Sequence, residues 1–257
     1  MKKYMDFFEK CSNYYMSIAK NDFQKLHIKR KIEHCKRVNK LAVEIAKKLN
    51  FSSEKIYLIS IASLFHDIGR FKQFYKYSTY DDNISCNHAL LSVEMLEEEN
   101  ILDDFTEEIK EKIFDIIFYH NCTQIPKNIS SELEIYVSIL RDADKIDWIY
   151  AMVNIIPKLS KEDQKVFYSN KEDKKIVSKE IVNLILNNKT ILKSQVDTID
   201  ELRLVSMGWL TSGMKLKESY EIIREKDLIN KTFELISDFD EKTIVYNYIT
   251  GYFSEAK

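Results

Sequence analysis

Four histidines and one aspartate fall where the surrounding residues predict buried helix faces. His34, His66, His88, His120 and Asp144 each lie three, four or seven positions from apolar side chains. Residues at these separations share one face of an α-helix, so we expect all five polar groups to point into the core. A single such histidine is usually a satisfied core residue. Five together favour a shared partner, because buried polar groups without one are costly, and a divalent cation meets that need.

The residue types restrict which cation this is. Imidazole combined with carboxylate suits Mn²⁺, Fe, Co, Ni or Zn, whereas Mg²⁺ prefers a shell made of oxygen atoms. A bound ion of this kind lowers the pKa of water from about 15.7 towards ~7 and so makes hydroxide available at neutral pH. The residues therefore predict a metal site at which such a hydroxide can form.

The adjacent pair His66–Asp67 sets a geometric condition. Successive residues of a helix point about 100° apart, so both side chains reach one ion only where a helix ends. Gly69 follows closely and is expected to supply the backbone freedom for that turn. The run LFHDIGR is accordingly interpreted as the C-terminus of a helix that presents two ligands.

The elements that must position these side chains are expected to be helices. The chain has only four glycines and two prolines, too few for the turns of a β-rich fold of 257 residues. Apolar residues recur at helical spacing over about 27–49, in a segment that Ser52 or Ser53 caps, and over 113–117. Three starts have the sequence of a capping box, namely Asp104 with Glu107, Ser131 with Glu134, and Thr198 with Glu201. The fold class predicted is all-α.

Composition bounds the rest of the chain. We expect one helical domain over 1–257, with a metal-site half at about 22–156 and a helical extension at about 157–257, divided near Pro157. The 39 basic and 41 acidic residues give a net charge of −2, which offers no basis for a nucleic-acid polymer or membrane partner. The four cysteines have no zinc-knuckle or redox spacing, and no apolar run is long enough for a membrane span. A cytoplasmic location is expected.

The order of these residues resembles a known family. His34, the pair His66–Asp67 and Asp144 within RDADKID resemble the HD superfamily of metal-dependent phosphohydrolases, and HDIGR resembles the HDIG variant of its motif. The resemblance covers roughly residues 27–150. It implies an HD-type helical bundle with additional C-terminal helices, a small-molecule phosphate mono- or diester or nucleotide as substrate, and a first metal shell of these four residues.

The resemblance also assigns roles to the other histidines. His88 and His120 resemble the extra ligands of the binuclear branch, in which Asp67 would bridge two metal ions. The alternative is one metal ion, with both histidines donating hydrogen bonds to substrate phosphate. Independently of the resemblance, Arg70 is a candidate phosphate clamp, or else a cation at a helix C-terminus, and Lys145 is a second cationic candidate for catalysis.

The polar and aromatic segment 71–87 is expected to form a loop over the site. Lys72 and Tyr77 within it are candidate substrate contacts, since an aromatic ring there can stack on a base. Packing is the alternative. Asp147 is expected to cap or pair on its helix in preference to orienting a histidine.

Departures from family patterns leave the substrate open. Arg70 stands where some nucleotide hydrolases of the superfamily have an acidic residue, and neither the HD-x-x-E-D nor the HD-GYP pattern is present. Two other functions are kept as alternatives. One is a di-iron oxygenase of the HD type, and the other is a non-catalytic metal-binding regulatory domain.

Overall fold

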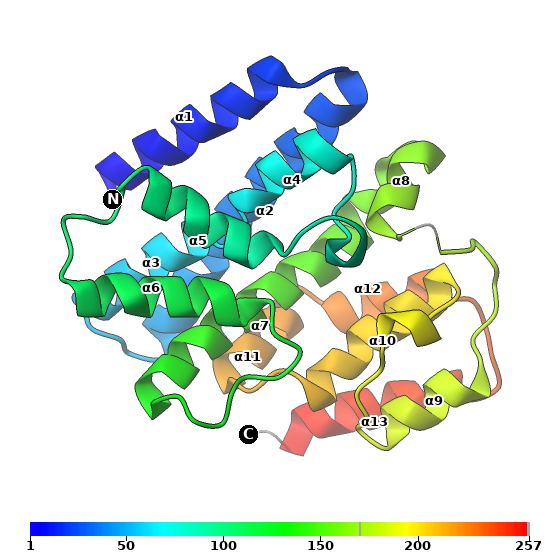
Figure 1. Cartoon of the computed structure of the whole chain (residues 1–257). Helices are drawn as coiled ribbons and strands as arrows, with labels where there is room; N and C mark the ends of the chain where they lie inside the picture. The colour runs from blue at the N-terminus through cyan, green and yellow to red at the C-terminus, as the bar shows by residue number, and fades with distance from the viewer. Residues whose placement is uncertain (170, 256–257) are drawn as a thin grey trace. The chain divides into compact units, whose positions relative to one another are not determined.

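The all-α prediction is confirmed. The computed structural model describes residues 1–169 and 171–255, and over these ranges the chain forms α-helices and short 3₁₀ turns without a β-strand (Figure 1). An isolated bridge pairs Glu172 with Thr198. None of the described helices combines the length and the apolar character needed to cross a bilayer.

The chain divides into two compact units, Met1–Asp147 and Trp148–Lys257. The division falls inside α7 (Ser131–Asn154), earlier in the chain than the boundary predicted near Pro157. A helix can run through such a division because its backbone hydrogen bonds are local and need no support from either unit. The organisation of 1–257 as one domain stays a prediction.

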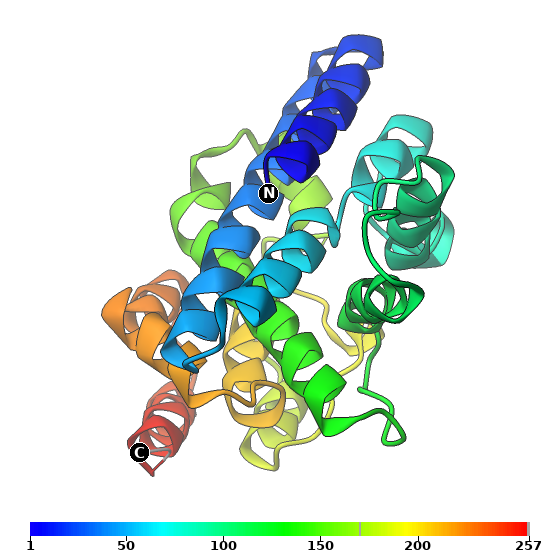
Figure 2. The same ribbon diagram turned by 90° about the vertical axis from the view of Figure 1, so that its left-hand side faces the viewer.

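The first unit brings together the helices that carry the candidate ligands. α2 packs against α1, α3 and α4, and α6 packs against α3 and α5. Figure 2 shows α1 lying along the N-terminal part of α2. The remaining bounds are α1 (Lys2–Ile18), α2 (Asp22–Lys48), α3 (Ser53–Phe65), α4 (Gly69–Tyr77), η1 (Asp82–Ile84), α5 (His88–Glu98) and α6 (Glu107–His120).

Short polar residues begin several of these helices. Asn21 Oδ1 accepts a hydrogen bond from Gln24 N at 2.9 Å at the start of α2. Ser52 Oγ accepts from Lys55 N, so Ser52 is the cap of α3. Each such cap satisfies an otherwise unpaired backbone N–H and stabilises the helix by about 1 kcal/mol.

Two of the three predicted capping boxes are wrong. α6 begins after Thr106, because residues 101–104 form turns and the Asp104 carboxylate pairs with Lys3 Nζ at 2.7 Å. α7 is capped one residue earlier than predicted, since Ser130 Oγ accepts from Leu133 N at 3.2 Å. Thr106 makes no side-chain cap hydrogen bond, so α6 lacks the predicted cap, whereas α7 has a serine cap one residue before the predicted position.

The predicted loop over 71–87 is wrong in its first part. α4 continues to Tyr77 because Phe71 and Phe74, three residues apart, are both fully buried on one helix face. Ser78 ends the helix in the left-handed conformation, with φ of 51°. The loop that remains is 78–87, with η1 inside it.

The second unit forms its own core. α10 packs against α9, α12 and α13. Met152, Ile156, Tyr168 and Ile199 make a buried apolar cluster. The bounds are η2 (Ile156–Lys158), α8 (Lys161–Phe167), α9 (Lys179–Leu186), η3 (Lys193–Gln195), α10 (Ile199–Ser212), α11 (Lys217–Glu225), α12 (Leu228–Leu235) and α13 (Lys242–Glu255).

The third predicted capping box, at the start of α10, is confirmed. Thr198 Oγ1 accepts from Glu201 N at 3.1 Å while Glu201 Oε2 accepts from Thr198 N at 3.2 Å. Glu201 also accepts from the backbone N–H groups of Asp197 and Ser178. Burial acts to raise the pKa of Glu201, but these N–H groups hold that pKa below its ordinary value.

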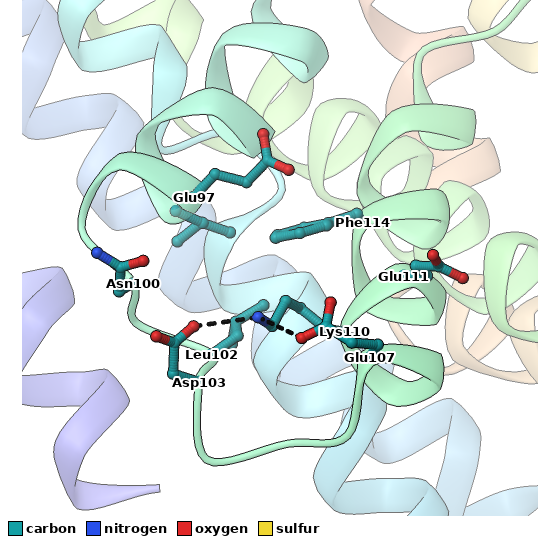
Figure 3. A pocket seen from close by; sticks show the side chains of 9 residues that line it. Glu97, Asn100, Leu102, Asp103, Glu107, Lys110, Glu111 and Phe114 are labelled. Carbon is teal, nitrogen blue, oxygen red and sulfur yellow. Dashed lines mark hydrogen bonds and ion pairs between the residues drawn. The ribbon is translucent and has the colours of Figure 1, made fainter.

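A cavity of about 320 Å³ lies between the end of α5 and the start of α6 (Figure 3). Its wall carries the acidic residues Glu97, Asp103, Glu107 and Glu111. Lys110 Nζ lies 3.1 Å from Asp103 Oδ1 and 3.0 Å from Glu107 Oε1. Among the residues described as lining the cavity there is no histidine, so it is separate from the cluster of candidate ligands.

Candidate metal centre

Asp67 lies at the centre of the predicted ligands. Its Oδ2 atom lies 3.4 Å from His34 Nε2 and 3.4 Å from His66 Nε2. Its Oδ1 atom lies 3.2 Å from His88 Nε2 and 3.8 Å from His120 Nε2. The Asp67 side chain is only 4% exposed. One buried carboxylate therefore presents a separate oxygen to each of two imidazole pairs.

Asp144, on α7, completes the group around Oδ2. Its Oδ1 atom lies 3.2 Å from His34 Nε2 and 3.9 Å from His66 Nε2. Its side chain is 37% exposed, which makes the Asp144 edge the open side of the cluster. The donor atoms of His34, His66 and Asp144 lie within 4.8 Å of one another, as do those of His66, Asp67 and His120. All six predicted ligands thus meet.

The second nitrogen of every imidazole in the cluster is held by a hydrogen-bond acceptor. Because carbonyl and carboxylate oxygens only accept, Nδ1 donates in each case, and a neutral ring then carries its lone pair on Nε2. Nδ1 of His34 donates to Asp147 Oδ2 at 2.7 Å, that of His66 to Ser63 O at 2.8 Å, that of His88 to Asp82 Oδ2 at 2.6 Å, and that of His120 to Ile117 O.

The inward-facing atoms lack partners of their own. His66 Nε2 and Asp67 Oδ1 are buried without a hydrogen bond. His88 Nε2 and His120 Nε2 face each other at 3.2 Å, although both rings already donate through Nδ1. Each buried acceptor left unpaired costs about 1–3 kcal/mol, which a shared cation removes. These donors fit a divalent metal ion.

Burial and neighbouring charges set the protonation states of three of these side chains. Burial lowers the pKa of His66, and burial together with the Arg70 guanidinium lowers the pKa of His88 to about 4, so both rings are neutral at pH 7. Burial acts to raise the pKa of Asp67, but the Lys31 ammonium and the nearby imidazoles hold it well below its ordinary value. Neutral imidazoles and an ionised carboxylate are the protonation states that bind metal.

His34 differs from the other imidazoles. Burial and the Lys31 ammonium act to lower the pKa of His34, but the carboxylates of Asp144, Asp147 and Asp67 raise it to about 10. This imidazole therefore carries a proton at pH 7 when only protein groups surround it. A metal ion bound there takes the place of that proton.

The role predicted for Gly69 is wrong in its mechanism. No glycine in the described residues has a positive φ, and α4 begins at Gly69 after a short turn over 66–68. Glycine is needed there because α5 packs against it. A Cβ atom at Gly69 would lie 2.7 Å from His88 O and 2.7 Å from Ser92 N. His66 and Asp67 reach the cluster from this turn between α3 and α4.

Arg70 holds the loop over 78–87 through protein contacts. Its Nη1 atom donates to Gln73 Oε1 at 2.7 Å, to Tyr80 O at 2.6 Å and to Asp82 Oδ1 at 2.8 Å. Its Nε atom lies 3.6 Å from Asp67 Oδ1. These contacts favour a positioning role over the predicted phosphate clamp.

The remaining predicted residues lie further from the cluster. Tyr77 is 45% exposed at the end of α4 and lies under Lys76 Nζ, while Lys72 is half-buried on the same helix. Among the described contacts, no hydrogen bond or ion pair joins Lys72 or Tyr77 to the histidines. Lys145 is half-buried on α7, next in the chain to Asp144.

Three residues contact the candidate ligands directly; sequence reasoning passed over Lys31 and Asp82 and gave Asp147 a different role. Lys31 Nζ contacts Asp67 Oδ2. Lys31 precedes His34 by three residues, and this spacing could have indicated that both side chains share one helix face. Asp147 was expected to cap or pair on its helix. Instead it holds His34, and its position three residues after Asp144 was the corresponding signal. Asp82 had no such signal, since it lies in a loop.

Comparison with known proteins agrees with this geometry. A family model described as the HD domain matches residues 32–149, a segment that begins just before His34 and ends just after Asp147. Neither the curated proteins nor the solved structures include a significant match. Residues 32–149 of this chain are therefore a domain of the HD superfamily, whose members are generally metal-dependent hydrolases.

Proposed function

We propose that the chain is a phosphohydrolase that holds two divalent metal ions bridged by Asp67 and hydrolyses a phosphate mono- or diester, with nucleotides among the substrates to test. The observation that supports this most strongly is the placement of the two Asp67 oxygens, each against its own pair of Nε2 atoms. This division suits a carboxylate that bridges two ions with one oxygen on each.

The proposal gives each side chain a role. His34, His66 and Asp144 would hold one ion with Asp67 Oδ2, and the other two histidines would hold the second with Oδ1. When bound, such ions supply positive charge at the phosphoryl group and hydroxide at neutral pH. Asp147 fixes the ring of His34 so that Nε2 stays directed inward. Lys145, next to the open edge at Asp144, stays a candidate for substrate contact.

Metal analysis of the purified protein, followed by an activity panel, tests the proposal. Protein reconstituted with Mn, Fe, Co, Ni or Zn should contain about two ions per chain and release phosphate from at least one phosphomonoester, diester or nucleotide. Asp67→Asn should lose both metal and activity, whereas Asp6→Asn, an exposed change on α1, should retain both. Absence of hydrolysis with every metal would refute the phosphohydrolase assignment.

The same six side chains suit two irons, so oxygen consumption is measured beside phosphate release. Oxygen uptake by iron-loaded protein without hydrolysis would identify the di-iron oxygenase alternative. Metal binding with neither activity would leave the regulatory domain.

A further inference from the structure

We propose that Lys31 is a phosphate-binding residue whose ammonium group contacts Asp67 until a substrate phosphoryl group arrives. This inference rests on the proposed function. It adds a substrate contact on α2, on the side of Asp67 that faces His34 and His66.

Lys31 is held in the cluster and not at the protein surface. It precedes His34 by three residues on α2, so the two side chains leave the same helix face. Its side chain is 19% exposed, and Nζ contacts Asp67 Oδ2. That oxygen is also the one 3.4 Å from His66 Nε2. The ammonium therefore lies beside the position where an anion would meet the first metal ion.

The ammonium has capacity left for a ligand. A lysine carries three N–H donors, and the described contacts of Nζ are the Asp67 carboxylate and the ring of Tyr80, whose centroid lies 5.8 Å away. The ring attracts the cation without accepting a conventional hydrogen bond. Two donors thus remain for an anion.

Comparison with Arg70 separates the two cations that flank Asp67. Arg70 lies near Oδ1, but its Nη1 atom already donates to three protein oxygens, one on Gln73 of α4 and two in the loop over 78–87. Lys31 lies on Oδ2 with no such set of acceptors. A flexible four-carbon stem also lets an ammonium move from a carboxylate to a nearby phosphate at small cost. The contacts thus assign phosphate binding to Lys31 and loop positioning to Arg70.

The test measures binding of inorganic phosphate to Mn²⁺-loaded full-length protein by isothermal titration calorimetry, after a separate titration of Mn²⁺ itself. Lys31→Met should weaken phosphate binding about 10- to 100-fold, the loss expected for a charge-assisted hydrogen bond. The affinity of the Lys31→Met protein for Mn²⁺ should stay equal or rise, because the ammonium that competes for Asp67 Oδ2 is absent. Lys31→Arg should restore most of the phosphate affinity.

Lys29→Met is the matched control, since Lys29 is exposed on the same helix and should bind phosphate like the wild type. Lys31→Gln is measured in parallel, and circular dichroism identifies a variant that does not fold. Unchanged phosphate affinity in the folded Lys31→Met and Lys31→Gln proteins would overturn the inference, as would a loss of Mn²⁺ binding in them. Failure of the wild type to bind Mn²⁺ would refute the metal centre itself, and the inference with it.

Discussion

Replacement of Gly69 by alanine should destabilise the first unit. The added Cβ would meet His88 O and Ser92 N at 2.7 Å each and Ser92 Oγ at 2.9 Å. Real Cβ atoms do not approach backbone atoms this closely, so α5 must move away from the start of α4. Overpacking of this kind costs about 1–3 kcal/mol, and the backbone contacts place Gly69→Ala at the upper end. Alanine returns at most ~1 kcal/mol through helix propensity.

The net loss should therefore be about 2 kcal/mol, which lowers the melting temperature by roughly 4–8 °C in a unit of this size. Thermal and urea unfolding followed by circular dichroism measure it. Because His88 begins α5, the same shift should also reduce the metal content of the purified variant. Both effects come from one displacement, so they should appear together.

Two other glycines provide internal controls. Gly251 has no atom within 4 Å of its virtual Cβ, so Gly251→Ala in α13 should be neutral or stabilising by up to ~1 kcal/mol. At Gly208 the nearest atom is Ile185 Cγ1 at 3.1 Å, a side chain that can shift by a few tenths of an ångström. The melting temperature of Gly208→Ala should therefore lie between those of Gly69→Ala and Gly251→Ala. A Gly69→Ala protein that melts at or above the wild-type temperature would refute this reasoning.

Two further predictions concern carboxylates. Asp82→Ala should weaken metal binding 10- to 100-fold at the position held by His88, and Asp147→Ala should do the same at the position held by His34. Each variant removes the carboxylate that accepts from Nδ1 and orients the ring. Metal titrations of the variants that match the wild type would contradict this prediction. Glu201→Gln should destabilise the protein at pH 7 but not in acid. The lowered folded pKa of Glu201 contributes stability above its unfolded value of 4.5, and that contribution is lost as the pH falls through the folded pKa. Urea unfolding at both pH values measures the difference, which should shrink in acid.

The candidate ligands could be selected from the sequence because that selection depends on short-range rules. Helical spacing places His34 and Asp144 on the apolar faces of their helices, although the Asp144 side chain stays 37% exposed. The low glycine and proline content likewise predicted helices without knowledge of their packing. The spacing does not predict which oxygen of Asp67 faces which imidazole ring, because that depends on how the four helices that carry the rings pack together.

Residues supported by loops or by close packing escaped sequence reasoning. Asp82 contacts His88, Arg70, Gln73 and Asn121 from a 3₁₀ turn, and no periodicity marks such a position. Gly69 was correctly singled out, but for backbone freedom, which is the usual reason for a glycine after a helix. Close approach of a second helix is a tertiary property. The same limit explains why α4 was taken for loop, since a helix of nine residues gives a weak periodic signal.

The Ser92 hydroxyl links the backbone on both sides of Asp67. It accepts from Gly69 N at 2.9 Å and lies 3.0 Å from His66 O and 2.9 Å from His88 O, so its single proton serves one carbonyl at a time. One ligand from each imidazole pair is thereby tied to the same oxygen atom. If two ions bind as proposed, a displacement around one would be transmitted to the other through this hydroxyl, and loading of the two positions should then be cooperative.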